Sequence, residues 1–178
     1  NAEKIRCVVQ IVHGMAEYIE RYEEFAGFLT ERGCVVTGED HMGHGKSVGR
    51  DGKRGYFCEQ DPATVLVRDV HRLKKATQAL YPNVPYVIMG HSMGSFIVRN
   101  YMFRYGTGIS AAIIMGTGMQ PPALLRASKI VIGIQKLFCG PEHVGRLIDR
   151  LAFGAYNKEV ETPRTPFDWL SRDEERVD

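Results

Sequence analysis

The sequence contains little cysteine and almost no excess of either charge. Cysteine occupies only four of the 178 positions, and no two cysteines form a CxxC pair. This pattern excludes a disulfide-stabilised scaffold and a cysteine-based zinc site, and it favours a reduced, cytoplasmic protein. Lysine and arginine number 23 against 21 acidic residues, so the net charge is only +2. A balance so close to zero gives no reason to expect nucleic acid or an anionic membrane as a partner.

Long apolar runs and a signal segment are also missing. No run approaches the roughly 18 apolar residues that a membrane-spanning helix needs, so we expect no integral membrane span. The chain begins at Asn1 without an initiator methionine, and a strand-like segment follows almost at once. No apolar core of a signal peptide precedes that strand. Because the initiator methionine is missing, we expect the chain to be a piece of a longer protein.

The composition that remains is that of a folded globular protein. Hydrophobic residues make up 44% of the chain and charged residues 25%. A chain of this size can bury about 70% of the surface that it exposes when unfolded. These values exclude a disordered, collagen-like or coiled-coil protein.

Short β-branched runs alternate with segments of helical periodicity along the first two thirds of the chain. Asp61 followed by Pro62 is a typical helix start, and Gly33 and Gly106 are typical helix stops. We expect strands at residues 5–12, 34–37, 86–89 and 109–115, and helices at 21–32, 62–80 and 93–105. This order predicts an α/β fold with a mostly parallel sheet and helices on both of its faces.

The alternation stops after Gly118. Residues 123–138 and 144–153 have helical patterns, and a polar tail with Pro163 and Pro166 begins at Asn157. We therefore divide the chain into a core of residues 1–118 and a second, helical segment of residues 119–178.

The residues Gly90-His91-Ser92-Met93-Gly94 fit the pattern GxSxG between a predicted strand and a predicted helix. In that context the pattern indicates a nucleophile elbow. The turn is so tight that side chains at Gly90 and Gly94 would clash, and the serine adopts a strained backbone conformation. The N-terminus of the following helix offers free N–H groups, so the Met93 amide can stabilise an oxyanion. His91 is interpreted as a packing and hydrogen-bonding residue.

A second turn, His13-Gly14-Met15, follows the first predicted strand. Neighbouring parallel strands end at the same edge of a sheet, so this turn can lie beside Ser92. Gly14 permits close approach of the backbone, and the Met15 N–H is the candidate for a second oxyanion donor. The alternative is that His13 and Gly14 only terminate a strand.

Taken together, the segments 13–17, 40–47 and 90–95 resemble α/β-hydrolases of the monoacylglycerol lipase and lysophospholipase type, a group that overlaps with serine aminopeptidase-like hydrolases. The resemblance extends over residues 5–178. It implies a partial α/β-hydrolase fold, Ser92 as the nucleophile and the Met15 and Met93 amides as the oxyanion hole. It also implies that segment 40–47 is a scaffold for the site. Neither a cofactor nor a metal is implied. Ser95 is a departure, because many relatives have glycine there.

In this fold the catalytic acid and base follow the serine along the chain. The only histidine after Ser92 is His143, and no strand-like run follows Met115. The segment from Met119 onward resembles the beginning of the family's helical lid. We therefore expect the triad Asp and His to lie beyond Asp178 and the isolated chain to be nearly inactive. His143 remains the alternative base.

Two other motifs are interpreted as structural. Gly45-Lys46-Ser47 is similar to the end of a phosphate-binding P-loop, but Asp40 stands where that pattern needs glycine. His41 and His44 could form a metal pair, but no third ligand has a useful spacing. We therefore expect no nucleotide site and no metal site here.

The lid segment is apolar around much of its first helix. These residues are Leu124, Leu125, Ile130, Val131, Ile132, Ile134, Leu137 and Phe138. One interpretation is that they pack against other parts of a lid. The other is that they line an acyl-chain tunnel or contact a lipid interface.

The leading hypothesis is a serine hydrolase of carboxylic esters that forms an acyl-enzyme on Ser92. The expected substrate is a small ester or lipid, such as a monoacylglycerol or a lysophospholipid. Two alternatives remain: a serine peptidase on the same fold, and a non-catalytic α/β-hydrolase-fold protein that uses the pocket for binding.

Overall fold

In a computed structural model, which describes residues 5–140, 157, 160–165, 168–173 and 177, four strands form one sheet. They are β1 (Cys7–Val12), β2 (Cys34–Gly38), β3 (Tyr86–His91) and β4 (Ala111–Met115), in the spatial order β2-β1-β3-β4. Each neighbouring pair is parallel. All four strands therefore end at the same edge, and the turns that follow β1 and β3 are neighbours there.

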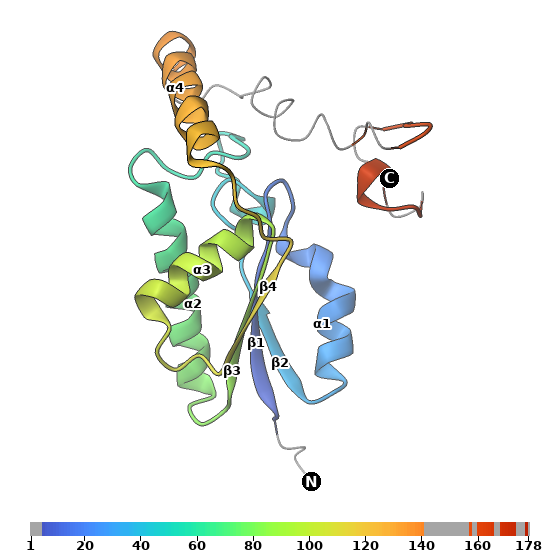
Figure 1. The fold of residues 1–178 in the computed structure, drawn as a ribbon. Helices are drawn as coiled ribbons and strands as arrows, with labels where there is room; N and C mark the ends of the chain where they lie inside the picture. Colours follow the sequence, from blue (N-terminus) through green and yellow to red (C-terminus); the bar gives the residue numbers. More distant parts are fainter. Residues whose placement is uncertain (1–4, 141–156, 158–159, 166–167, 174–176, 178) are drawn as a thin grey trace. The chain divides into compact units, whose positions relative to one another are not determined.

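Helices cover both faces of this sheet, as predicted. Helix α1 (Glu23–Thr30) lies on one face, and α2 (Pro62–Leu80) and α3 (Met93–Tyr105) lie on the other (Figure 1). The predicted spans of α2 and α3 match the structure. Asp61 caps α2, with its side chain accepting a hydrogen bond from the Thr64 N–H at 3.3 Å. The predicted helix 21–32 is corrected in the structure: a 3₁₀ turn at Ile19–Tyr22 precedes α1.

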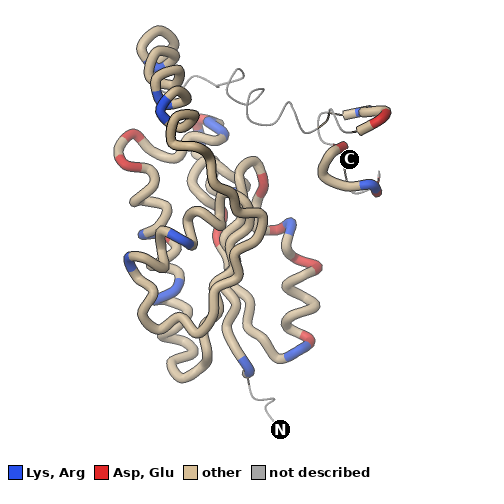
Figure 2. The backbone as a smooth tube through the Cα atoms, viewed as in Figure 1, with Lys and Arg blue, Asp and Glu red and all other residues tan. Residues whose placement is uncertain are grey.

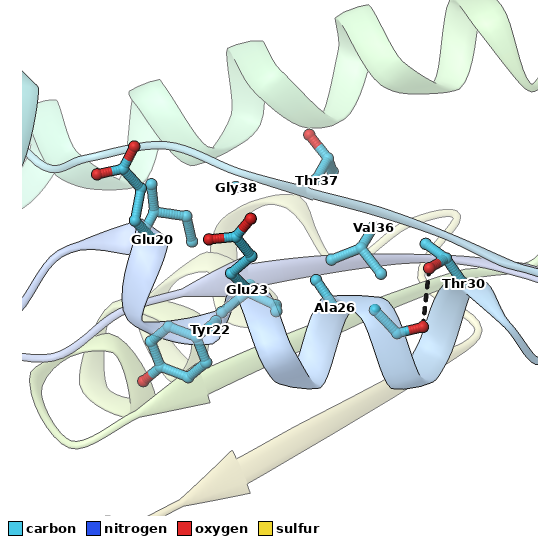
Figure 3. Close-up of a pocket in the computed structure, with 11 residues that line it drawn as sticks. Glu20, Tyr22, Glu23, Ala26, Thr30, Val36, Thr37 and Gly38 are labelled. Atoms are coloured by element: carbon cyan, nitrogen blue, oxygen red, sulfur yellow. Dashed lines mark hydrogen bonds between the residues drawn. The ribbon is translucent and has the colours of Figure 1, made fainter. Parts of the chain in front are cut away.

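The strands carry no charged residue, and charge is confined to the helices and loops (Figure 2). This pattern is typical of a parallel sheet whose two faces are buried. The face under α1 is less well covered, because neither Phe25 nor Phe28 of that helix is buried. A groove of about 490 Å³ lies between α1 and β2, where Ala26 faces Val36 (Figure 3).

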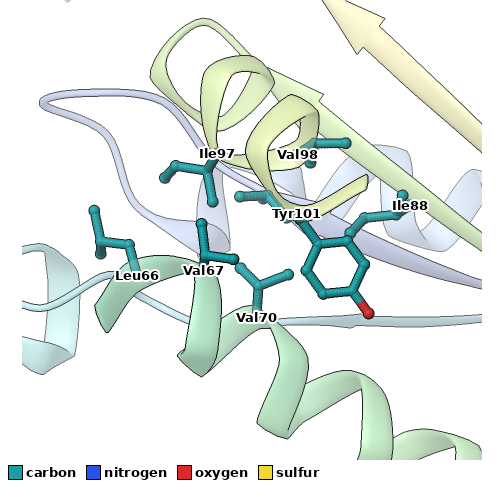
Figure 4. Close-up of a cluster of buried hydrophobic side chains, with 8 residues drawn as sticks. Leu66, Val67, Val70, Ile88, Ile97, Val98 and Tyr101 are labelled. Atoms are coloured by element: carbon teal, nitrogen blue, oxygen red, sulfur yellow. The ribbon is translucent and has the colours of Figure 1, made fainter. Parts of the chain in front are cut away.

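The main hydrophobic core lies on the opposite face, between the sheet and helices α2 and α3. Side chains of the two helices point toward one another and toward Ile88 of β3 (Figure 4). The buried members are Val12, Leu66, Val67, Val70, Ile88, Ile97, Val98 and Tyr101. Each buried aliphatic side chain contributes roughly 1.5–3 kcal/mol relative to an exposed one. This packing fixes α3, and therefore its N-terminus, against the end of β3.

Residues 121–178 form a second compact unit. Within it, α4 spans Pro122–Cys139, close to the predicted helix 123–138, whereas the predicted helix 144–153 lies outside the described residues. Large apolar side chains of α4 are exposed, including Ile130, Leu137 and Phe138. Among the helices of the described chain, none is long and apolar enough to cross a membrane.

Candidate active site

Ser92 lies in the turn between the end of β3 and the first residue of α3. Its backbone adopts φ 52° and ψ −118°, a region that residues with a side chain rarely occupy. The Ser92 N–H donates to the Met115 carbonyl oxygen at 3.0 Å, which anchors the turn to the end of β4. The Ser95 hydroxyl donates to the Ser92 carbonyl oxygen at 2.6 Å. The strained conformation is therefore held from both sides.

The two glycines of the motif leave no space for a side chain. A Cβ atom at Gly94 would overlap the Val12 carbonyl oxygen and would lie 2.6 Å from the His13 carbonyl oxygen. A Cβ at Gly90 would overlap the Gly94 carbonyl oxygen. These contacts involve backbone atoms, which cannot move aside as the end of a flexible side chain can. The strand-to-helix turn therefore requires glycine at both positions.

The turn after β1 lies directly against the Ser92 turn. A Cβ atom at Gly14 would lie 3.1 Å from the Ser92 Cβ, so the Gly14 backbone packs beside the serine. The structure thus brings His13, Gly14 and Met15 together with residues 90–94 at one edge of the sheet, because β1 and β3 are parallel neighbours.

His13 is completely buried and holds the turn by hydrogen bonds from both ring nitrogens. Nδ1 lies 2.8 Å from the Gly14 carbonyl oxygen, and Nε2 accepts a hydrogen bond from the His41 N–H at 3.0 Å. Since Nε2 is an acceptor, the proton is on Nδ1, which donates to Gly14. Burial lowers the pKa of His13, which favours this neutral form. The ring also packs on His41, at 4.1 Å between ring centroids.

The loop after β2 completes this support. The Asp40 carboxylate accepts hydrogen bonds from the Ile19 and Lys46 N–H groups, each at 2.8 Å. Burial raises the pKa of Asp40, but these hydrogen bonds outweigh it and the net pKa is lowered. His44 has its Nδ1 3.1 Å from the Met42 carbonyl oxygen, and its ring stacks on Phe57. In the described residues, no group of three potential metal ligands is present.

Two N–H groups are available near Ser92. Met93 is the first residue of α3, and the first N–H of a helix has no partner within the helix. The Met15 N–H has no acceptor among the described residues. Both amides sit in the two turns that meet at Ser92, and the N-terminus of α3 adds a positive dipole end. The arrangement can stabilise negative charge that develops on a ligand beside the serine.

Glu17 is a residue of the site that sequence reasoning missed. Its carboxylate is only 8% exposed, and its Oε1 accepts hydrogen bonds from the Gly14 N–H, from the Tyr22 hydroxyl at 3.0 Å and from His91 Nδ1 at 3.0 Å. Burial raises the pKa of Glu17, but the bonds from His91, Gly14 and Tyr22 outweigh it and the net pKa is lowered. The sequence signal that could have indicated Glu17 is that it is the single acidic residue in the turn of residues 13–17.

Within residues 5–140, no side chain is hydrogen-bonded to the Ser92 hydroxyl. The neighbouring His91 ring faces Glu17 through Nδ1, and His143 lies outside the described residues. The described part of the site therefore contains a serine and two available amides, without a base in contact with the serine. The groove between α1 and β2 includes none of the predicted site residues.

Comparison with known families gives one match over nearly the whole chain. A family described as "Serine aminopeptidase, S33" matches residues 3–178. The crystal structure of a thermostable carboxyl esterase from Bacillus coagulans superposes with a TM-score of 0.86 at 34% identity, covering 99% of this chain and 56% of that one.

Two curated relatives have similar names. A monoacylglycerol lipase from Mycolicibacterium smegmatis is 32% identical over 131 residues, which is 71% of this chain and 45% of that protein. A monoglyceride lipase from Mus musculus is 36% identical over 92 residues, 52% of this chain and 28% of that protein. The chain thus spans less than half the length of these two relatives.

Proposed function

This chain belongs to the serine aminopeptidase S33 family of α/β-hydrolases, and on that premise we propose that the protein hydrolyses carboxylic esters with Ser92 as its nucleophile. Membership of this family confirms the resemblance that the three sequence motifs indicated, and the parallel sheet confirms a partial α/β-hydrolase fold. The observation that carries the proposal is the backbone of Ser92 at φ 52°, held between two glycines and against Gly14.

The proposed reaction proceeds through an acyl-enzyme. The Ser92 hydroxyl oxygen attacks the ester carbonyl carbon, and the Met15 and Met93 N–H groups donate to the oxyanion of the tetrahedral intermediate. The alcohol then leaves, and water hydrolyses the acyl-enzyme to release the carboxylic acid. A general base must take the serine proton, and we assign it to a histidine oriented by an acidic residue, both beyond Asp178. The chemistry uses no cofactor and no metal.

The proposed substrate is a monoacylglycerol or a similar lysophospholipid-like ester. Support comes from the names of the relatives, which are monoacylglycerol lipases and a carboxyl esterase. Further support comes from α4, whose apolar side chains are exposed in its own unit and suit contact with an acyl chain or a lipid interface. We propose that residues 119–178 form the beginning of a lid and that the protein acts in the cytoplasm.

A peptidase on the same fold is the second candidate, because the matching family is described as a serine aminopeptidase. A non-catalytic binding protein is the third. The backbone of Ser92 argues against the third candidate, because a residue in such a conformation costs about 1–3 kcal/mol and is retained mainly where function requires it.

The experiment compares the full-length protein with its Ser92→Ala variant, and uses Thr107→Ala, at an exposed hydroxyl residue between α3 and β4, as the control. Ester hydrolysis is measured on monoacylglycerols of increasing chain length, and peptidase activity on aminoacyl anilides. We expect Ser92→Ala to lower kcat for the ester by about 10⁴-fold or more and Thr107→Ala to leave it unchanged. Faster turnover of the anilides would favour the peptidase. Equal activity of the Ser92→Ala protein would overturn the proposal.

A further inference from the structure

The Glu17 carboxylate connects the two turns that meet at Ser92. It accepts from the Gly14 N–H in the turn after β1 and from His91 Nδ1, in the residue before Ser92. The Tyr22 hydroxyl adds a third donor, and Arg21 Nη1 lies 3.6 Å from the other carboxylate oxygen. A buried carboxylate with this many donors is held in one position, because every movement would leave a donor unsatisfied.

The local backbone delivers the carboxylate to this place. Ala16 adopts φ 58°, one of the few positive values at a residue other than glycine in the described chain. This conformation folds the chain back within three residues, so that the Glu17 side chain reaches the N–H of Gly14, at the start of the same turn. A side chain on Gly14 would itself lie 3.3 Å from the Glu17 carboxyl carbon. The turn is therefore closed around the carboxylate.

Closing the turn also fixes the direction of the Met15 N–H. The Gly14 N–H is held by Glu17, and the Gly14 carbonyl oxygen is held by His13 Nδ1 at 2.8 Å. The peptide between Gly14 and Met15 is planar and trans, so its N–H points opposite to that carbonyl. With both ends of Gly14 fixed, the Met15 N–H has one direction available to it.

We propose that Glu17 is a positioning residue that holds the Met15 amide in the oxyanion hole. Through its contact with His91, Glu17 also keeps that amide beside the Ser92 turn. This inference rests on the proposed function. Glu17 does not touch the reacting atoms; it acts through the Gly14–Met15 peptide. Its effect is therefore expected on the transition state, where the oxyanion forms, and hardly on binding of the substrate.

The test uses the full-length protein with the variants Glu17→Gln and Glu17→Ala, assayed on an ester and on the matching thionoester. A thiocarbonyl sulfur accepts hydrogen bonds poorly, so the ratio of the two rates reports the oxyanion hole. Removal of one oxyanion donor lowers kcat by about 10²–10³-fold. We expect Glu17→Ala to approach that loss and Glu17→Gln to lose about tenfold, with KM within about twofold and a lower ester-to-thionoester ratio in both.

Glu20→Gln is the matched control, because Glu20 is three residues away, is 52% exposed and pairs with Lys46 on the surface. It should leave the kcat and the ester-to-thionoester ratio unchanged. His91→Ala removes the connection to the Ser92 turn at a half-exposed side chain, so it provides a second variant if the Glu17 variants fail to fold. We expect His91→Ala to lower kcat and the ratio in the same direction.

The outcomes separate the two proposals. An unchanged ester-to-thionoester ratio in the folded Glu17 variants, or in His91→Ala if those do not fold, would overturn the positioning role even if the melting temperature fell. Retention of ester hydrolysis by the Ser92→Ala protein would overturn the proposed function instead. A lower ratio at unchanged KM, together with loss of activity in Ser92→Ala, would support both.

Discussion

Two of the few strained backbone positions in the described chain lie at the candidate site. Among the described residues other than glycine, only Ala16, Asp61 and Ser92 have a positive φ. Ala16 folds the turn of residues 13–17 and Ser92 lies in the adjoining turn, so two of the three belong to the same site. Each such residue costs of order 1–3 kcal/mol, which the core under α2 and α3 and the hydrogen bonds of His13 and Ser95 can offset.

At the residue scale, Gly94→Ala is expected to be strongly destabilising. The new Cβ would overlap the carbonyl oxygen of Val12, which belongs to the central strand β1. Relief of the overlap requires α3 to move away from the sheet, and we expect a loss of about 3 kcal/mol or more in the free energy of unfolding. Chemical denaturation of the variant measures this loss.

Gly27→Ala is the control for that substitution. Gly27 lies inside α1, and a Cβ there would meet no atom within 4 Å. Alanine favours a helix over glycine by about 0.5–1 kcal/mol, so this variant should be more stable than the parent protein. Equal losses in the two variants would contradict the steric account of the Ser92 turn.

Glu39 supplies a pH-dependent prediction. Its Oε1 is buried and has no hydrogen-bond partner among the described residues. Burial, with a smaller contribution from the Asp69 charge, raises the pKa of Glu39 from 4.5 to about 7. The folded protein therefore binds more protons than the unfolded chain between these values, and stability falls as the pH rises from about 4.5 to 7. Glu39→Gln removes this fall. We expect a gain of about 1–2 kcal/mol at pH 8 and little change at pH 4.5, since partial exposure screens the full effect.

Melting temperatures of the two proteins across pH 4.5 to 8 measure the difference. The exposed Glu31→Gln is the control, because Glu31 lies at the surface beside Arg32. A constant difference between the Glu39→Gln protein and its parent at every pH would show that the carboxyl does not titrate in this range.

At the element scale, the start of α2 depends on Asp61. Its side chain accepts from the Thr64 N–H, and its backbone adopts φ 42°, where asparagine and aspartate are tolerated better than alanine. Asp61→Ala removes the cap and adds backbone strain, so we expect a loss of about 1–2 kcal/mol. Asp61→Asn keeps the acceptor and the tolerated conformation, and we expect a change within about 0.5 kcal/mol. Urea denaturation distinguishes the two. A loss in Asp61→Asn as large as that in Asp61→Ala would contradict the capping role.

Local signals at the ends of helices decide which parts of the fold could be predicted from the sequence. The bounds of α2 and α3 follow from local signals, such as Asp61 with Pro62 and the elbow before Met93, and the structure matches them. The predicted start of the first helix, at residue 21, was wrong, because the apolar spacing that begins near Arg21 does not distinguish a 3₁₀ turn from an α-helix. Packing rather than spacing decides between them.

The candidate site also has one part that the sequence predicts and one part that it does not. The Ser92 turn could be predicted because its pattern of two glycines around a serine, between a strand and a helix, lies within five neighbouring residues, although the atoms that exclude a side chain at Gly94 belong to Val12 and His13. The role of Glu17 could not, since it depends on the positive φ of Ala16 and on His91, which is 74 positions away in the sequence. Contacts across such a distance appear only once the order of the parallel strands is known.

At the scale of the whole molecule, apolar surface remains exposed in both compact units. All five residues of the edge strand β4 are exposed, including Ile113 and Met115, and so are the large side chains of α4. An uncovered edge strand invites pairing with another strand. A polypeptide of these 178 residues is therefore expected to self-associate in solution, which light scattering over a concentration series measures. A strictly monomeric polypeptide at high concentration would contradict this expectation.

The reactivity of Ser92 in the same polypeptide provides the last prediction. No described side chain is hydrogen-bonded to its hydroxyl. The proposed nucleophile therefore has no activating base among the described residues, and we expect it to attack electrophiles slowly even with the Met15 and Met93 amides as proposed oxyanion donors. Loss of a triad base lowers turnover by about 10⁴–10⁶-fold, and we expect labelling by a serine-directed fluorophosphonate to fall by a comparable factor relative to the full-length protein. Mass spectrometry of the labelled peptide measures the rate at Ser92. Rapid labelling would require a base within the 178 residues. His143 would then be the first candidate, and a His143→Ala polypeptide that still reacted rapidly would exclude it.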